Sequence, residues 1–232
     1  MTRASGSGTP AEKSRTEGAG LVTSHKQGRT RTYRLAPDGE HVGISQVRRD
    51  AAGNQDLVAV VARLHRTASS YELVDPRVVS ERGELKSFTP DGTRVLVAQF
   101  TPGPFDTANP DVISIDLATG ERRRVTFAAD YDEPVELSPD GRWYVVGSGR
   151  GTGLFETVSQ VRRPSLLGTA LDPLTAYLFA HHRDELLEGW LVPTGSEADG
   201  DQGQRIPAPD GGLDGRPIWN WRPDGTALVY WE

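Results

Sequence analysis

The sequence predicts an all-β fold built from repeated four-stranded units, on two observations. The first is composition: 26 glycines and 16 prolines among 232 residues, with 36% hydrophobic residues, favour many short strands joined by tight turns. The second is a turn that occurs four times, a Pro-Asp-Gly triplet followed by β-favouring residues. The triplets are Pro37, Asp38 and Gly39; Pro90, Asp91 and Gly92; Pro139, Asp140 and Gly141; and Pro223, Asp224 and Gly225. Their prolines lie 53, 49 and 84 residues apart, and a period of this size is typical of propellers and other stacked arrays.

Each triplet has the residues that a turn between two antiparallel strands requires. Proline fixes φ at the second turn position, aspartate suits the third, and glycine at the fourth permits the positive φ with which the chain enters the next strand. After the third triplet, Tyr144 and Val146 lie on one face of the following strand and Val145 lies on the other. Because the equivalent positions after the other triplets are also mostly apolar, we expect strands that are buried on both faces.

The remaining strands are expected in chain order. The first unit has a strand near Thr30 to Leu35, then "HVGISQ", "DLVAVVARL" and "YELVD", and the second has "VISID" and "RRVTF" after its turn. A degenerate fourth unit has "LDPLTAYLFA" in place of the turn and second strand, followed by "GWLVP" and "QRIP". One domain over 29–232 then contains units at about 29–78, 79–127, 128–165, 166–210 and, in part, 211–232. Residues 1–28 are rich in serine, glycine, threonine and charge, which predicts a disordered arm.

The third unit carries the clearest resemblance to a known family. Its segment "RRVTFAADYDEPVELSPDGRWYVVGSGRGTGLF" resembles the WD40-like (PD40) repeats of the TolB type, whose blades place a Ser-Pro-Asp-Gly turn between their first two strands. The resemblance extends over roughly 30–232 and implies a β-propeller, usually of six or seven blades. Since the sequence supplies about four and a half units, we expect an incomplete propeller. The N-terminal residues, a segment outside this sequence or a strand from a partner would complete the last blade.

Charge and composition limit the partners. The net charge of -6 gives no positive field that would attract nucleic acid, so we expect no nucleic-acid partner. The chain has no cysteine, and we expect no cofactor. It has neither a secretory signal nor an apolar run of the roughly 20 residues that span a bilayer. This predicts no membrane span and a cytoplasmic location by default, although TolB-like relatives are often exported.

Three segments could be interpreted as ligand sites. The glycine-rich run 147–153 suggests a phosphate loop, but the β-favouring residues after it argue for an interstrand loop. His181 and Glu185 would converge on a metal ion only if their segment were a short helix, because successive strand residues point to opposite faces. The carboxylates in 130–134 could bind calcium, but an acidic loop leading into a strand explains them better. The prediction is therefore a solvated loop around His181 and Glu185, with no assigned metal site.

Other conspicuous residues are expected to be structural. The arginine runs 48–49, 122–124 and 162–163 fit strand faces or loops, and the tryptophans fit packing between units. A Gly-x-Ser-x-Gly nucleophile motif is absent from the sequence, and we predict no catalytic residue. The leading hypothesis is a non-catalytic scaffold that binds a protein or a small ligand at the loops on one end of its blades. The alternative is the propeller part of a prolyl-oligopeptidase-like hydrolase whose catalytic domain lies outside this chain.

Overall fold

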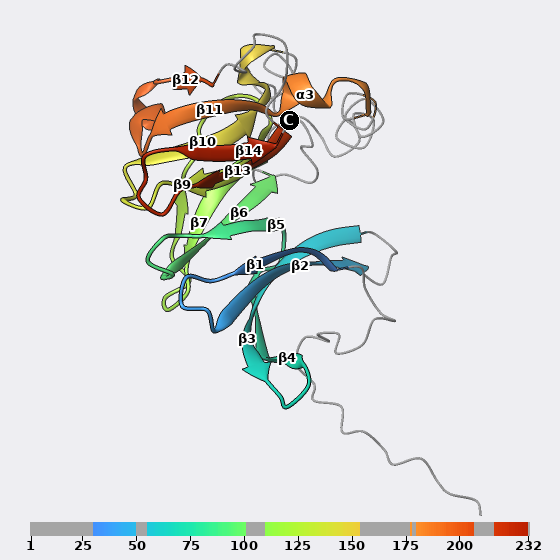
Figure 1. Cartoon of the computed structure of the whole chain (residues 1–232). Coiled ribbons are helices and arrows are strands. Elements are labelled where there is room, and N and C mark those ends of the chain that lie inside the picture. The colour runs from blue at the N-terminus through green and yellow to red at the C-terminus, as the bar shows by residue number, and fades with distance from the viewer. Residues whose placement is uncertain are drawn as a thin grey trace, which may run out of the picture.

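The computed structural model describes residues 30–49, 55–100, 110–153, 177, 180–206 and 216–231. Within these residues the chain forms three four-stranded antiparallel sheets and one two-stranded sheet, and each sheet takes its strands in chain order (Figure 1). The predicted all-β fold of four-stranded units is therefore confirmed. The arm expected over residues 1–28 lies outside the described residues.

The strands have the following bounds. The first sheet contains β1 (Thr30–Leu35), β2 (His41–Arg49), β3 (Gln55–Arg66) and β4 (Tyr71–Ser80). The second contains β5 (Glu84–Phe88), β6 (Arg94–Phe100), β7 (Pro110–Asp116) and β8 (Arg122–Arg124). The third contains β9 (Asp132–Leu137), β10 (Trp143–Ser148), β11 (Glu188–Pro193) and β12 (Gln204–Arg205), and the last contains β13 (Arg216–Trp221) and β14 (Leu228–Trp231). Short helices in the described part of the chain include η1 (Gly149–Gly151), α3 (Arg183–Leu186) and η2 (Ser196–Asp199).

The third sheet corrects the expected unit boundaries. The run "GWLVP", assigned from sequence to a separate fourth unit over 166–210, forms β11 and pairs with β10 without a break, from Trp143 opposite Pro193 to Ser148 opposite Glu188. The run "QRIP" contributes β12 to the same sheet. The units expected at 128–165 and 166–210 are therefore one unit, with a long insertion between its second and third strands. The last two triplets are 84 residues apart, and β11 and β12 of the third sheet lie between them. The run "LDPLTAYLFA" falls mostly outside the described residues.

The four Pro-Asp-Gly turns share one geometry. In each, the glycine N–H donates a hydrogen bond to a carbonyl three residues earlier, for example from Gly141 to Ser138 at 2.8 Å. The four glycines have φ of 70°, in the left-handed region that other residues rarely adopt. The aspartate completes the turn, since Oδ1 of Asp140 accepts hydrogen bonds from the Ser138 hydroxyl and from the backbone N–H of Arg142. The turns therefore place the start of the second strand in the same way in every sheet.

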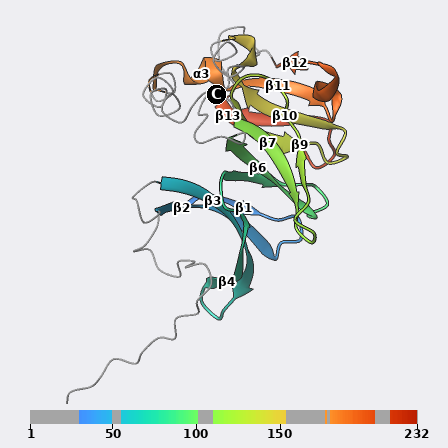
Figure 2. The ribbon, with the colours of Figure 1, turned by 180° about the vertical axis from the view of Figure 1, so that it is seen from behind.

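The first strands of successive sheets lie beside one another. A side chain joins each pair to a backbone carbonyl: Arg34 Nε to Lys86 O at 2.6 Å, Ser87 Oγ to Val135 O at 3.1 Å, and Trp221 Nε1 to Glu136 O at 3.2 Å. The sheets accordingly follow one another in chain order, with the first at one end of the stack and the third towards the other, in both views (Figures 1 and 2). This is the arrangement of consecutive propeller blades.

Apolar side chains fill the spaces between sheets. Between the first and second sheets, the core includes Val61, Leu85, Phe88 and Val97. Between the second and third sheets, Leu96 packs with Val112, Val135 and Tyr144. Since side chains from both faces of β6 enter these two cores, the second sheet is buried on both faces, as the apolar sequence pattern predicts.

Candidate functional site: a cleft between the second and third sheets

Adjacent turns pack against each other at two of the three positions where successive sheets meet. A Cβ atom placed on Gly92 would lie 3.7 Å from Cδ of Pro37 in the preceding turn, and one placed on Gly225 would lie 3.6 Å from Cδ of Pro139. The corresponding position on Gly141 has no atom within 4 Å. The turn of the second sheet and the turn of the third sheet are therefore separated, whereas the pairs on either side are in contact.

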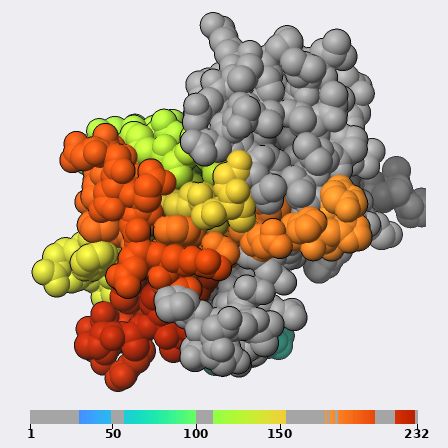
Figure 3. All heavy atoms as spheres, turned by 90° about the horizontal axis from the view of Figure 1, so that it is seen from above, coloured from blue at the N-terminus to red at the C-terminus, as the bar shows by residue number. Residues whose placement is uncertain are grey.

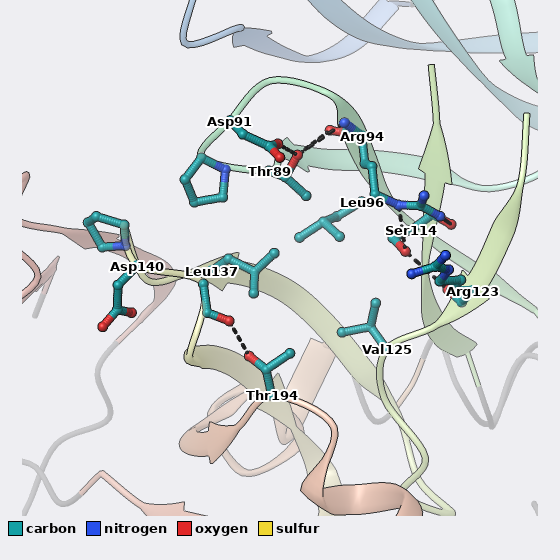
Figure 4. A pocket seen from close by; sticks show the side chains of 13 residues that line it. Thr89, Asp91, Arg94, Leu96, Ser114, Arg123, Val125, Leu137, Asp140 and Thr194 are labelled. Atoms are coloured by element: carbon teal, nitrogen blue, oxygen red, sulfur yellow. Dashed lines mark hydrogen bonds between the residues drawn. The ribbon is translucent and has the colours of Figure 1, made fainter. Parts of the chain in front are cut away.

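A cleft of about 350 Å³ opens at this separation, which is within the size range of ligand pockets in proteins. Residues from both turns, from β6, β7, β8 and β9, and from the end of β11 surround it (Figure 4). The lining residues are Thr89, Pro90, Asp91, Arg94, Leu96, Ser114, Arg123, Val125, Leu137, Pro139, Asp140, Gly141 and Thr194. The cleft is thus formed by two sheets together and by neither alone.

The base of the cleft is apolar and its rim is polar. Leu96 is fully buried in the core between the two sheets, and Val125 and Leu137 pack against the same core from its edge. Asp91 and Asp140, from the two turns, lie on one side of these apolar side chains, and Arg123 lies on the other (Figure 4). An apolar base with a few polar groups around it is the common composition of a ligand-binding cleft.

Arg94 is a fixed part of the wall. Its Nε donates to the Ser114 hydroxyl at 3.3 Å, and its guanidinium forms ion pairs with Asp116 at 3.2 Å and Glu121 at 3.3 Å. These contacts tie β6 to β7 and to the turn that follows β7. Because two carboxylates already neutralise this cation, Arg94 shapes the cleft and supplies no free positive charge to it.

The two aspartates on the rim differ in their partners. Hydrogen bonds from Thr89 and Thr93 lower the pKa of Asp91, and hydrogen bonds from Ser138 and Arg142 lower the pKa of Asp140 to about 2. Both carboxylates are therefore ionised at neutral pH. Asp140 forms an ion pair with Arg142 at 2.6 Å, whereas Asp91 has no ion pair among the residues that the structure describes. Within that part of the chain, Asp91 thus contributes a negative charge without a paired cation.

At the opposite end of the strands from these turns, a network of buried charges lies between the same two sheets. Arg150 donates to Asp132 at 3.0 Å and to Glu197, and all three side chains are almost completely buried. On the facing sheet, Arg124 pairs with Asp111 at 2.6 Å. Burial raises the pKa of Asp111 to about 6 against the effect of Arg124, and the charges of Asp132 and Glu197 add to the increase. Burial also raises the pKa of Asp132, although Arg150 opposes this effect.

The residues considered for a metal site lie in the insertion. A short helix, α3, does form here, and Leu186 lies close to Gly149 of η1, so these two segments are adjacent on the molecular surface (Figure 3). The His181 ring packs on Tyr177 with the ring centroids 4.5 Å apart, and the carboxylate of Glu185 lies 3.4 Å from Nδ1 of His182. No group of three or more potential metal ligands occurs in the described part of the chain. His181 and Glu185 therefore remain without an assigned metal role.

The other candidate segments have structural contacts. In the glycine-rich run, the Ser148 hydroxyl accepts a hydrogen bond from the Arg150 N–H at the start of η1. In the acidic segment, Asp132 pairs with Arg150. Trp219 is buried and packs closely on Gly147 and Gly189, where a Cβ atom would lie 3.2 Å and 2.8 Å from its ring. The contacts of Trp219 with these two glycines attach the last sheet to the third. The arginine run 162–163 lies outside the described residues.

The cleft has no signature in the sequence. The triplets that form part of its rim predict only turns, and the residues from other strands, such as Ser114, Val125 and Thr194, carry no local signal. The contact of Pro37 with Gly92 and its absence at Gly141 depend on the spacing between sheets. The available signal was the repetition itself, which places all four triplets at the same end of successive sheets.

Similarity to known proteins is found among solved structures. No protein-family model matches the chain, and no curated protein sequence matches it. Among solved structures, the chain is similar to a protein assigned as TolB from Agrobacterium tumefaciens, with 18% identity and a TM-score of 0.43 over 88% of this chain and 69% of that one. It is also similar to TolB from Acinetobacter baumannii, with 13% identity and a TM-score of 0.41 over 87% of this chain and 48% of that one. Similarity to an acylaminoacyl peptidase from Pyrococcus horikoshii, with 14% identity and a TM-score of 0.37, covers 52% of this chain and 17% of that one.

The successive four-stranded sheets define an all-β protein of the propeller class. Among the described residues, none of the helices is long and apolar enough to span a membrane.

Proposed function

We propose that the protein is a non-catalytic binding scaffold with PD40-type repeats, and that it holds its ligand in the cleft between the second and third sheets. The observation that carries this proposal is the separation of the two turns at Gly141, which opens a cleft of about 350 Å³ where the neighbouring turns are in contact. The interface between the second and third sheets has the same turns as its neighbours but contains a cleft with a polar rim. It is therefore the best-supported binding position on the described surface. No separate observation favours the alternative of a propeller from a larger hydrolase.

The shape and fixed walls of the cleft support this role. Arg94 holds three segments of the second sheet together, and the Thr194 hydroxyl donates to the Gly141 carbonyl at 2.9 Å, which fixes the opposite rim. Because both walls are held before a ligand arrives, little ordering entropy is lost on binding. Apolar side chains at the base supply burial, and the ionised aspartates on the rim supply orientation.

Titration of the isotope-labelled full chain with a library of capped dipeptides, followed by NMR, tests the proposal. We expect the shifts that respond to binding to cluster on the two turns, on Ser114 and Val125, and near Thr194. The variant Thr194→Trp places a large ring at the exposed rim and should reduce these responses at least several-fold. Ser69→Trp, at an exposed turn of the first sheet, is the control and should bind as the unmodified chain does.

Two results would contradict the proposed function. One is the absence of any saturable response to the library. The other is a response centred elsewhere, for example on the first strands of the sheets, that Thr194→Trp leaves unchanged. Thermal melting of both variants shows whether they retain the fold, so that a loss of binding can be assigned to the cleft.

A further inference from the structure

The cleft leaves open a position that a proline ring occupies at the two neighbouring turn contacts. The Pro37 ring faces Gly92, where an added Cβ atom would lie 3.7 Å from it, and the Pro139 ring faces Gly225, where an added Cβ atom would lie 3.6 Å from it. A glycine presents a flat backbone surface with no side chain to obstruct the ring. Gly141 has the same backbone conformation, with φ of 70°, but its surface faces the cleft. Because a proline ring faces the equivalent glycine at both neighbouring turns, a proline ring should also fit the open surface of Gly141.

The charges beside this position favour a cation. Asp91 lines the cleft next to Pro90, and the hydrogen bonds from Thr89 and Thr93 go to its Oδ1 atom. Its carboxylate has no ion pair among the described residues, whereas the equivalent Asp224 pairs with Arg222 at 2.9 Å, and Asp140 pairs with Arg142. Across the cleft, Arg123 is paired with Glu121 at 3.0 Å. The uncompensated charge on the rim is therefore negative.

We propose that the cleft binds an extended segment of a partner protein in which a proline adjoins a lysine or arginine, with the pyrrolidine ring on Gly141 and the cation beside Asp91. This inference rests on the proposed function, because it specifies the occupant of the same cleft. A proline-containing segment is preorganised in an extended conformation, so it loses less entropy on binding than other sequences of the same length. The proline ring provides selectivity by its shape. The flanking cation provides the ion-pair partner that Asp91 lacks among the described residues.

Four capped tripeptides separate these two contributions: Lys-Pro-Lys, Lys-Ala-Lys, Lys-Leu-Lys and Glu-Pro-Glu. Each is titrated into the full chain, and its affinity is read from the NMR shifts of cleft residues. We expect Lys-Pro-Lys to bind most tightly. Replacing proline with alanine should weaken binding by about tenfold, since roughly two methylene groups are no longer buried. Replacing lysine with glutamate should weaken binding by a similar or larger factor at low ionic strength.

The variant Asp91→Asn tests the charge within the protein. Asparagine retains the oxygen that accepts the hydrogen bonds from Thr89 and Thr93, so the turn is preserved. We expect several-fold weaker binding of Lys-Pro-Lys and a smaller loss of affinity for uncharged dipeptides. The matched control is Asp224→Asn, because Asp224 accepts from Thr226 the hydrogen bonds that Asp91 accepts from Thr93, but does not line the cleft. This control should bind as tightly as the unmodified chain.

The outcomes distinguish this inference from the proposed function. Equal or tighter binding of Lys-Leu-Lys, or equal binding of Glu-Pro-Glu, would overturn the assigned occupant while the cleft remained a binding site. The same conclusion would follow if Asp91→Asn and Asp224→Asn had equal effects. If neither these peptides nor the dipeptide library perturbs the cleft, both the inference and the proposed function are wrong.

Discussion

The interface between the first and second sheets differs from the interface between the second and third. At the first interface, the sheets approach so closely that a Cβ atom on Gly43 would lie 2.7 Å from Cδ2 of Leu85, and the Pro37 and Gly92 turns are in contact. An ion pair that joins these sheets, Arg31 with Glu84, spans 4.0 Å and has an exposed arginine. At the second interface, Lys86 pairs with Glu133, Arg150 is buried with two carboxylates, and the turns are separated by the cleft.

This difference shows how one repeated unit acquires two kinds of interface. Aliphatic side chains allow the first pair of sheets to close from the core to the turns, because such contacts improve with close packing. The second pair must also accommodate charged side chains, whose burial is tolerated only when each charge has partners with defined geometry. The second interface therefore has an ionic network at one end of its strands and the cleft at the other end, between the turns. We interpret the first interface as structural and the second as the one that can bind a ligand.

The largest expected effect is the loss of Arg150. The substitution Arg150→Met leaves the carboxylates of Asp132 and Glu197 buried without their cation, which should lower the free energy of unfolding by about 3–5 kcal/mol. Chemical denaturation at pH 7 measures this change. The control is Arg142→Met, because Arg142 is exposed and its ion pair with Asp140 is screened by solvent, so its loss should have a much smaller effect. Equal effects of the two substitutions would show that the network does not stabilise the second interface.

An intermediate effect is expected from pH. Burial raises the pKa of Asp111 to about 6 from its ordinary value of 3.8, so the folded state binds this proton more tightly than the unfolded state does. The corresponding stabilisation is fully present below about pH 4 and is lost as the pH rises through 6. We expect the unmodified chain to lose about 2–3 kcal/mol relative to Asp111→Asn between pH 4 and pH 7.

The comparison with Asp111→Asn isolates this group. Burial also raises the pKa of Glu136, to about 7, but Glu136 is present in both proteins, and its contribution cancels in the difference. Denaturation curves collected at several pH values give the two stability profiles. Parallel profiles over this range would show that Asp111 is not the titrating group at the interface.

The turns could be predicted from the sequence, whereas the spacing between the sheets could not. The triplets predicted the all-β units because the turn chemistry is local, and β1 begins and ends as the pattern of Thr30 to Leu35 indicates. The predicted unit boundary near residue 165 was wrong because β11 pairs with β10 in one sheet. The long segment between these two strands makes the spacing of the triplets resemble that of an additional repeat. The cleft could not be predicted because it depends on the distance between two sheets, to which Ser114 and Thr194 contribute from separate strands and loops.

The smallest expected effect compares the prolines at a closed and an open pair of turns. Pro37→Ala and Pro90→Ala both remove a proline that fixes φ in the same type of turn, which should cost about 0.5–1 kcal/mol in each case. Pro37→Ala also removes the contact with Gly92, whereas the ring of Pro90 lines the cleft and the surface of Gly141 is open. We therefore expect Pro37→Ala to lower the free energy of unfolding by about 0.5 kcal/mol more than Pro90→Ala does. This difference is slightly less than the value of one buried methylene group, because the turn is exposed. Paired thermal and chemical denaturation of the two variants resolves this difference. An equal or larger effect of Pro90→Ala would mean that the two turns at the cleft are in contact in solution, and that the second interface closes as the first one does.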